Sequence, residues 1–173
     1  WEITIDEFGL DLNREYAENY EGESLGYRDE HPIKTIQNDI SKLKPAVFQV
    51  DRNYTRKKLE ILQDMIGDIL PIQVENQHLR WHFTPSEKVV RLMGLQQMMY
   101  SLFDEPDQMH KLYSFINENI LAFAKWMENE GLLTLNNANH FIGSGSYGFT
   151  NELPQDNKQN QKIERKDLWG NLN

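Results

Sequence analysis

Apolar and polar residues alternate at the start of the chain and then change to helical spacing. Residues 1–12, "WEITIDEFGLDL", have period two and predict a short hairpin or two strand segments. Residues 13–31 are polar and predict a loop. Residues 31–45, "HPIKTIQNDISKLKP", place isoleucines three and four apart, which predicts a short helix or turn. Residues 46–54 predict an extended connector.

Helical and strand patterns alternate from residue 55 onward. We expect three helices, over 55–67, from Ser86 to Phe103 and from Pro106 to Gly131, and two strands, over 69–74 and 132–135. Thr55 is the predicted N-cap of the first helix and Gly67 its predicted end. Strands separated by helices favour parallel pairing in an α/β layer. The first 54 residues would lead into this layer, residues 55–154 would form it, and residues 155–173 would be a polar loop with an apolar end.

Charge and composition exclude several classes of function. The 173-residue chain has a net charge of −9, and its first 30 residues hold ten acidic residues against two arginines. No basic stripe is present, which argues against nucleic acid as the main partner, and acidic surfaces repel anionic lipids. There is no cysteine, the acidic stretch at residues 1–12 lacks the apolar h-region typical of a signal peptide, and no apolar run reaches the ~20 residues that span a bilayer. We expect a cytoplasmic protein with a small-molecule substrate and leave open a homo-oligomer.

The stretch "LLTLNNANHFIGSGSYGF", residues 132–149, holds the first group of candidate site residues. Ligands of parallel α/β folds bind just beyond the carboxyl ends of the strands, and uncharged amides and hydroxyls follow the predicted strand here. Asn side chains offer both donors and acceptors, and the glycines let the backbone approach a ligand closely. A structural loop is the alternative, with the asparagines as caps and the glycines as turns. The predicted substrate contacts are Asn136, Asn137, Asn139, His140, Ser144 and Tyr147.

The stretch "HLRWHF", residues 78–83, follows the other predicted strand and holds the second group. Arg80 is a natural partner for a carboxylate, and we predict that Arg80, Trp81 and His82 contact substrate. The alternative is a surface arginine beside a packed tryptophan. His78 and His82 are four residues apart, but the segment is predicted as a loop and lacks an HExxH motif, so we predict no metal ligand.

Several stretches together resemble the uroporphyrinogen decarboxylase superfamily, which includes cobalamin-linked methyltransferases. They are "DEFGLDL" followed by "HPIKTIQNDISKLKP", then "GLQQMMYSLFDEPDQMHKLYSFINE", and finally "ENEGLLTLNN" with "GSGSYGFTNELP". The last is similar to a less characterised branch more than to the true decarboxylases. The resemblance implies an α/β fold that is the N-terminal to middle portion of a (β/α)₈ TIM barrel, because such barrels typically have about 250 residues.

The resemblance also implies a function. We expect part of a decarboxylase-like barrel enzyme that acts on a tetrapyrrole or a related carboxylated molecule, needs no cofactor within this chain, and is inactive on its own. The family's early catalytic aspartate has no counterpart that we can place here. Two alternatives stay open. A corrinoid-dependent methyltransferase would require corrinoid and zinc, and a non-catalytic binding protein would need neither.

Overall fold

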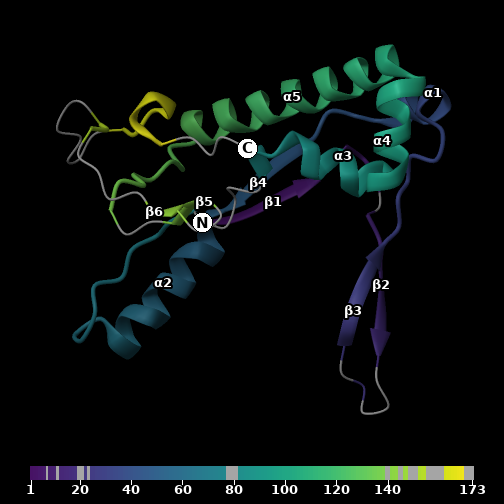
Figure 1. Ribbon diagram of the computed structural model, residues 1–173. Helices are drawn as coiled ribbons and strands as arrows, with labels where there is room; N and C mark the ends of the chain where they lie inside the picture. The colour runs from purple at the N-terminus through teal and green to yellow at the C-terminus, as the bar shows by residue number, and fades with distance from the viewer. Residues whose placement is uncertain are drawn as a thin grey trace. The chain divides into compact units, whose positions relative to one another are not determined.

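The computed structural model describes residues 1–173 except 7, 11, 19–21, 23, 77–81, 139–140, 144–145, 148–151, 155–161 and 170–173. The described part mixes helices with small sheets (Figure 1). Its strands form three two-stranded sheets, and no closed barrel is present among these residues. The chain divides into two compact units. Unit 1 comprises residues 1–5, 48–83 and 121–173, and unit 2 comprises residues 6–47 and 84–120.

The strands are β1 (Glu2–Asp6), β2 (Arg14–Glu18), β3 (Ser24–Asp29), β4 (Val47–Asp51), β5 (Phe141–Gly143) and β6 (Ser146–Tyr147). The α-helices are α1 (Ile36–Asp39), α2 (Arg52–Ile66), α3 (Pro85–Met93), α4 (Leu95–Asp104) and α5 (Pro106–Asn129). Two 3₁₀ turns are η1 (Ile40–Lys42) and η3 (Arg165–Asp167). The predicted short helix, the helix after residue 55 and the helix from Pro106 are confirmed, and Gly67 is the C-cap of α2 as predicted.

The core of unit 1 forms between the paired strands β1 and β4 and the last part of α5. Alternate residues of both strands are half-buried, and these packing residues are Ile3 and Ile5 in β1 and Phe48 and Val50 in β4. Successive side chains of a strand point to opposite faces, so one face of this sheet is apolar. That face packs against the fully or nearly buried residues Phe123, Met127 and Leu132.

Unit 2 contains an antiparallel hairpin where the pattern predicted a loop. β2 and β3 pair in antiparallel register, with Tyr16 opposite Tyr27 and Arg14 opposite Asp29. The Arg14 Nε atom lies 2.7 Å from Asp29 Oδ1, and its guanidinium lies 4.2 Å from the Tyr27 ring centroid. The loop prediction was wrong because these cross-strand pairs stabilise a hairpin that is solvent-exposed on both faces, so no alternation of apolar residues marks it.

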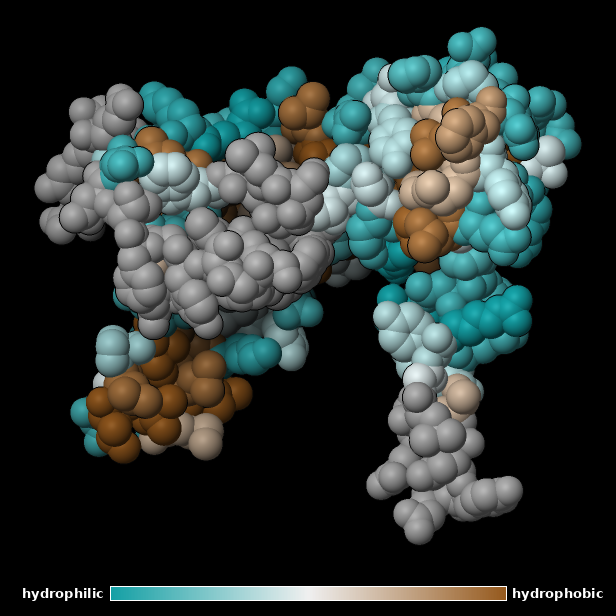
Figure 2. All heavy atoms as spheres, in the orientation of Figure 1, coloured by the Kyte–Doolittle hydropathy of each residue, from teal (hydrophilic) through white to brown (hydrophobic). Residues whose placement is uncertain are grey.

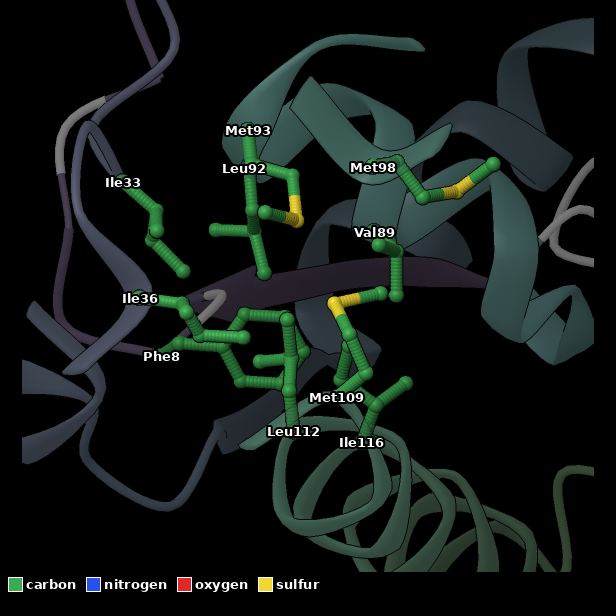
Figure 3. Packing of buried hydrophobic residues seen from close by; sticks show 10 residues of the cluster. All are labelled: Phe8, Ile33, Ile36, Val89, Leu92, Met93, Met98, Met109, Leu112 and Ile116. Carbon is green, nitrogen blue, oxygen red and sulfur yellow. The ribbon is translucent and has the colours of Figure 1, made fainter. Parts of the chain in front are cut away.

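The core of unit 2 is built from residues that lie far apart in the sequence. In Figure 3, Leu112 and Ile116 of α5 point toward Val89 and Leu92 of α3. Phe8 packs in the same cluster. The Phe8 and Phe115 ring centroids are 5.5 Å apart. The remaining fully enclosed members are Ile33, Ile36, Met93, Met98 and Met109.

A glycine divides the predicted helix over 86–103 into α3 and α4. Gly94 has φ +80°, a left-handed conformation that side chains rarely adopt. A Cβ atom at this position would lie 3.0 Å from the His31 ring, so both the backbone and the space favour glycine. The prediction of one continuous helix was therefore wrong at this residue. The N-cap prediction for α2 was also wrong, because Asp51 accepts the amide of Tyr54 at 2.8 Å.

The strands predicted over 69–74 and 132–135 are absent. Residues 71–76 and 132–137 lie in irregular structure, and the strands described within 69–149 are the antiparallel pair β5 and β6. The expectation of parallel pairing was wrong for these residues. Both segments have strand composition, but a strand exists only where another backbone completes its hydrogen-bond ladder. Their links to neighbours instead include the side-chain bond from Asn76 Nδ2 to the Leu132 carbonyl oxygen, 2.6 Å long and buried.

Within the described residues, no helix is long and apolar enough to cross a membrane.

Asp39 anchors the turn that leads into η1. Its carboxylate accepts the backbone amides of Lys34 and Thr35, both at 2.9 Å, and the Lys42 ammonium at 2.6 Å. The ion pair with Lys42, followed by these two amides, lowers the pKa of Asp39 from 3.8 to about 2. A carboxyl group with a lowered folded-state pKa stabilises the fold above its unfolded-state pKa.

We predict that replacing Leu112 by Ala lowers the free energy of unfolding by about 2–5 kcal/mol, because the substitution removes a fully buried side chain and leaves a cavity. Leu102→Ala is the matched control, since Leu102 is 43% exposed and should change stability by less than about 0.5 kcal/mol. Urea denaturation followed by circular dichroism measures both. Equal losses from the two substitutions would contradict the assigned core.

We also predict that the stabilisation from Asp39 is complete above about pH 4 and disappears as the pH falls toward 2, between the unfolded and folded pKa values. Asp39→Asn should be less stable than the wild type at pH 6. The difference should shrink between pH 4 and pH 2, where the wild-type carboxylate takes up its proton. Urea unfolding of both proteins across this range measures it, and a difference independent of pH would refute the assignment.

Candidate functional site

Three asparagine side chains of unit 1 connect four separate segments of the chain. Asn76 belongs to segment 71–76, and Asn136 and Asn137 belong to segment 132–137. Their hydrogen bonds reach the backbone at Leu132, Trp169 and Leu153. We call Asn76, Asn136 and Asn137 the amide cluster. Asn136 and Asn137 come four and five residues after the buried Leu132, and Asn76 donates a hydrogen bond to the Leu132 carbonyl oxygen.

Asn136 forms a reciprocal pair with the backbone of Trp169. Its Nδ2 donates to the Trp169 carbonyl oxygen at 2.9 Å, and its Oδ1 accepts the Trp169 amide at 3.0 Å. An asparagine amide has the same donor and acceptor groups as a peptide unit, so this pair resembles one step of a strand ladder. Asn137 Nδ2 donates to the Leu153 carbonyl oxygen at 2.9 Å. Both side chains thus position the segments around Leu153 and Trp169.

A second contact holds the segment that ends at Trp169. The carboxylate of Glu128, near the end of α5, accepts the backbone amide and the Nε of Arg165, each at 2.9 Å. The Arg165 backbone amide, followed by its guanidinium, lowers the pKa of Glu128 below its usual value. The segment from Glu164 to Trp169 is therefore attached at both ends, to α5 and to the amide cluster.

Two buried polar atoms next to these contacts have no hydrogen-bond partner among the described residues. They are the Oδ1 atom of Asn76, an acceptor, and the Nε1 atom of Trp169, a donor. Buried polar atoms are nearly always paired, so each unpaired one calls for an explanation. A donor group at Asn76 and an acceptor group at Trp169 would satisfy them. The sequence analysis missed both residues, since a single asparagine or tryptophan in a mixed segment carries no signal.

The other predicted site residues divide into three groups. His82 packs its ring against Phe123, with the centroids 5.9 Å apart in a T-shaped arrangement. Tyr147 lies in β6 opposite Phe141, and its side chain lies outside the described part of the chain. Five predicted contacts fall on residues that the structure does not describe, namely Arg80, Trp81, Asn139, His140 and Ser144. Substrate contact by these residues and by Asn136 and Asn137 stays a prediction.

The described residues contain no group of three or more His, Asp or Glu side chains arranged to hold a metal ion. Comparisons with protein-family models, with curated proteins and with solved structures gave no match to this chain.

We predict that Asn136→Ala loosens the segment around Trp169, because it removes both hydrogen bonds of the reciprocal pair, each worth about 1 kcal/mol. Arg165 and Lys166 are exposed trypsin sites in this segment, so their cleavage should become about 5- to 30-fold faster. Limited proteolysis with mass spectrometry measures the rates. Asn137→Ala is the control, since Asn137 bonds Leu153 instead, and equal acceleration by both variants would argue against the pair.

Proposed function

We propose that this chain is part of a uroporphyrinogen decarboxylase-like enzyme of the (β/α)₈ type that acts on a tetrapyrrole or a related small carboxylated molecule. The resemblance of the sequence to this superfamily suggests the class of enzyme, and one hydrogen bond supports the proposed location of the substrate-binding site. The buried bond between Asn76 Nδ2 and the Leu132 oxygen, 2.6 Å long, ties together the two segments that lead into the predicted polar stretches. Residues 77–82 follow one segment directly, and residues 138–147 follow the other.

The chemistry of the two stretches suits such a substrate. A tetrapyrrole presents pyrrole N–H donors and, in its carboxylated forms, carboxylate acceptors around an apolar macrocycle. The buried Oδ1 atom of Asn76 would accept from a pyrrole N–H, and the buried Nε1 atom of Trp169 would donate to a carboxylate. Arg80 adds a cationic group that binds carboxylates through two parallel hydrogen bonds. In the proposed site, neutral amides and one arginine bind the substrate, so the site itself carries little positive charge.

The proposed roles differ among the residues. The hydrogen-bonding groups of Asn136 are used on the Trp169 backbone, so Asn136 acts by positioning Trp169. Asn137 positions the backbone at Leu153 in the same way. Arg80, Asn76 and Trp169 are the proposed direct contacts. No residue of the chain is assigned to proton transfer, and we propose that binding by this chain occurs without turnover.

Binding is tested by titrating the chain with uroporphyrin, the stable octacarboxylate, and following the porphyrin absorbance. We predict saturable binding with a micromolar Kd, and no binding of a porphyrin that carries sulfonates in place of carboxylates. Arg80→Gln should weaken binding about tenfold, because hydrogen bonds to a charged group contribute about 1.5–3 kcal/mol. Arg28→Gln, on the exposed strand β3 of unit 2, is the matched control and should leave the Kd unchanged.

Turnover is tested by anaerobic incubation with uroporphyrinogen and chromatography of the oxidised products. The expected result is recovery of the octacarboxylate. Appearance of products with fewer carboxylates would overturn the proposed inactivity, and absence of saturable uroporphyrin binding would overturn the substrate class. Transfer of the methyl group from a methylcorrinoid to an added thiol, in a parallel incubation with zinc, would establish the methyltransferase alternative instead.

A further inference from the structure

The helix α2 presents an apolar surface that stays largely exposed in the described part of the chain. None of its fifteen residues is buried. Figure 1 labels α2, and Figure 2, in the same orientation, shows brown, hydrophobic atoms gathered over the lower end of this helix. Exposed fractions reach 59% for Ile61 and 68% for Met65. The other large exposed apolar residues on and just after α2 are Tyr54, Leu62, Ile66, Ile69 and Leu70. Contiguous patches of this kind mark interaction surfaces.

The spacing of the exposed stripe fits a partner helix. Tyr54, Lys58, Ile61 and Met65 are separated by four, three and four residues, the spacing at which one helix packs its side chains between those of another. Lys58 does not break the stripe, because its ammonium lies 5.9 Å from the Tyr54 ring centroid and its alkyl chain can cover apolar surface. The stripe is therefore a continuous seam about 17 Å long, at a rise of 1.5 Å per residue.

The charges of α2 are arranged against its own dipole. Arg56, Lys57 and Lys58 lie in its first half, whereas Glu60 and Asp64 lie in its second half and Asp68 follows its end. Cations near a helix N-terminus and anions near its C-terminus are unfavourable within a single helix. The internal pair between Arg56 and Glu60 is 3.9 Å long and has the less favourable order of charges along the chain. This arrangement of charges does not stabilise the α2 helix when it is unpaired.

We propose that α2 binds the α2 helix of a second copy of this chain in an antiparallel pair. The basic first half of each helix then lies against the acidic second half of the other, and the two helix dipoles oppose each other favourably. A parallel pair would place like charges together. This inference rests on α2 alone and does not depend on the proposed substrate.

One pair of residues specifies the orientation. Lys57 and Asp64 are seven residues apart on the same flank of the seam, and both are exposed. Neither has an ion-pair partner within the described ranges. In an antiparallel pair with its two-fold axis near Ile61, the same flanks of the two helices face each other. Lys57 of each copy would then meet Asp64 of the other, which gives two equivalent ion pairs beside the apolar seam.

The expected affinity is modest. A seam of one short helix buries less than the roughly 800 Å² per partner of a standard interface, so we expect a Kd of about 1–100 µM. Sedimentation equilibrium or light scattering over a range of concentrations should show a monomer–dimer equilibrium. Ile61→Asp should abolish the dimer, because it puts an unpaired charge at the centre of the seam. Phe103→Asp, at an 84% exposed apolar residue of α4, is the matched control and should leave the Kd unchanged.

Charge exchange tests the orientation. Lys57→Glu and Asp64→Lys should each weaken the dimer about tenfold or more, because each places like charges opposite one another at two positions. The double variant Lys57→Glu with Asp64→Lys should restore the wild-type Kd. A wild-type chain that stays monomeric well above 100 µM, or a dimer that survives Ile61→Asp, would overturn the proposed interface. Failure of the double variant to recover would overturn the antiparallel arrangement.

Discussion

Burial of one long helix face is the constraint on which both units depend. The helix α5 runs from Pro106 to Asn129, and its apolar residues serve two separate cores. Leu112 and Ile116 are enclosed in unit 2, whereas Phe123 and Met127 are enclosed in unit 1. Each sheet has two strands, and a two-stranded sheet in isolation is marginally stable at best. The helix therefore provides the surface on which the β1–β4 pair gains its stability.

The helices were predictable because their pattern is local. Residues three and four apart share one face of a helix, so Met109, Leu112 and Ile116 mark the buried face of α5 without knowledge of any partner. Pro106 and Gly67 mark boundaries because of their own backbone preferences. The break at Gly94 was missed because an isolated glycine within a helical pattern is usually tolerated. Its φ of +80° is revealed only with the structure.

The strands were less predictable because the sequence of one segment does not determine which other segment its backbone pairs with. Residues 71–76 and 132–137 have the composition of buried strands, yet they form no ladder in the described structure. Conversely, residues 14–29 pair as a hairpin with little apolar alternation, held by contacts such as that between Arg14 and Asp29. Strand composition favours a pleated, half-buried setting, and the neighbouring chain decides whether that setting exists.

The candidate site shows the same division between local chemistry and distant partners. The sequence identified Asn136 and Asn137 because uncharged amides cluster after an apolar run, and in the structure both side chains bond to backbone groups. It did not identify their backbone partners, which lie 16 residues away for Asn137 and 33 residues away for Asn136. Nor did it identify Asn76, whose position relative to Leu132 depends on a contact across 56 residues.

The two proposals concern different chemistry within unit 1. The amide cluster is polar and tied to the backbone, which suits a preorganised site because few groups must reorganise when a ligand binds. The seam of α2 is apolar and exposed, and water must be displaced from it before it contributes to stability. A helix with its charges against its own dipole gains little from folding by itself. In the proposed dimer the same charges become favourable, so association would stabilise α2 without altering the contacts that hold Asn76 and Asn136 in place.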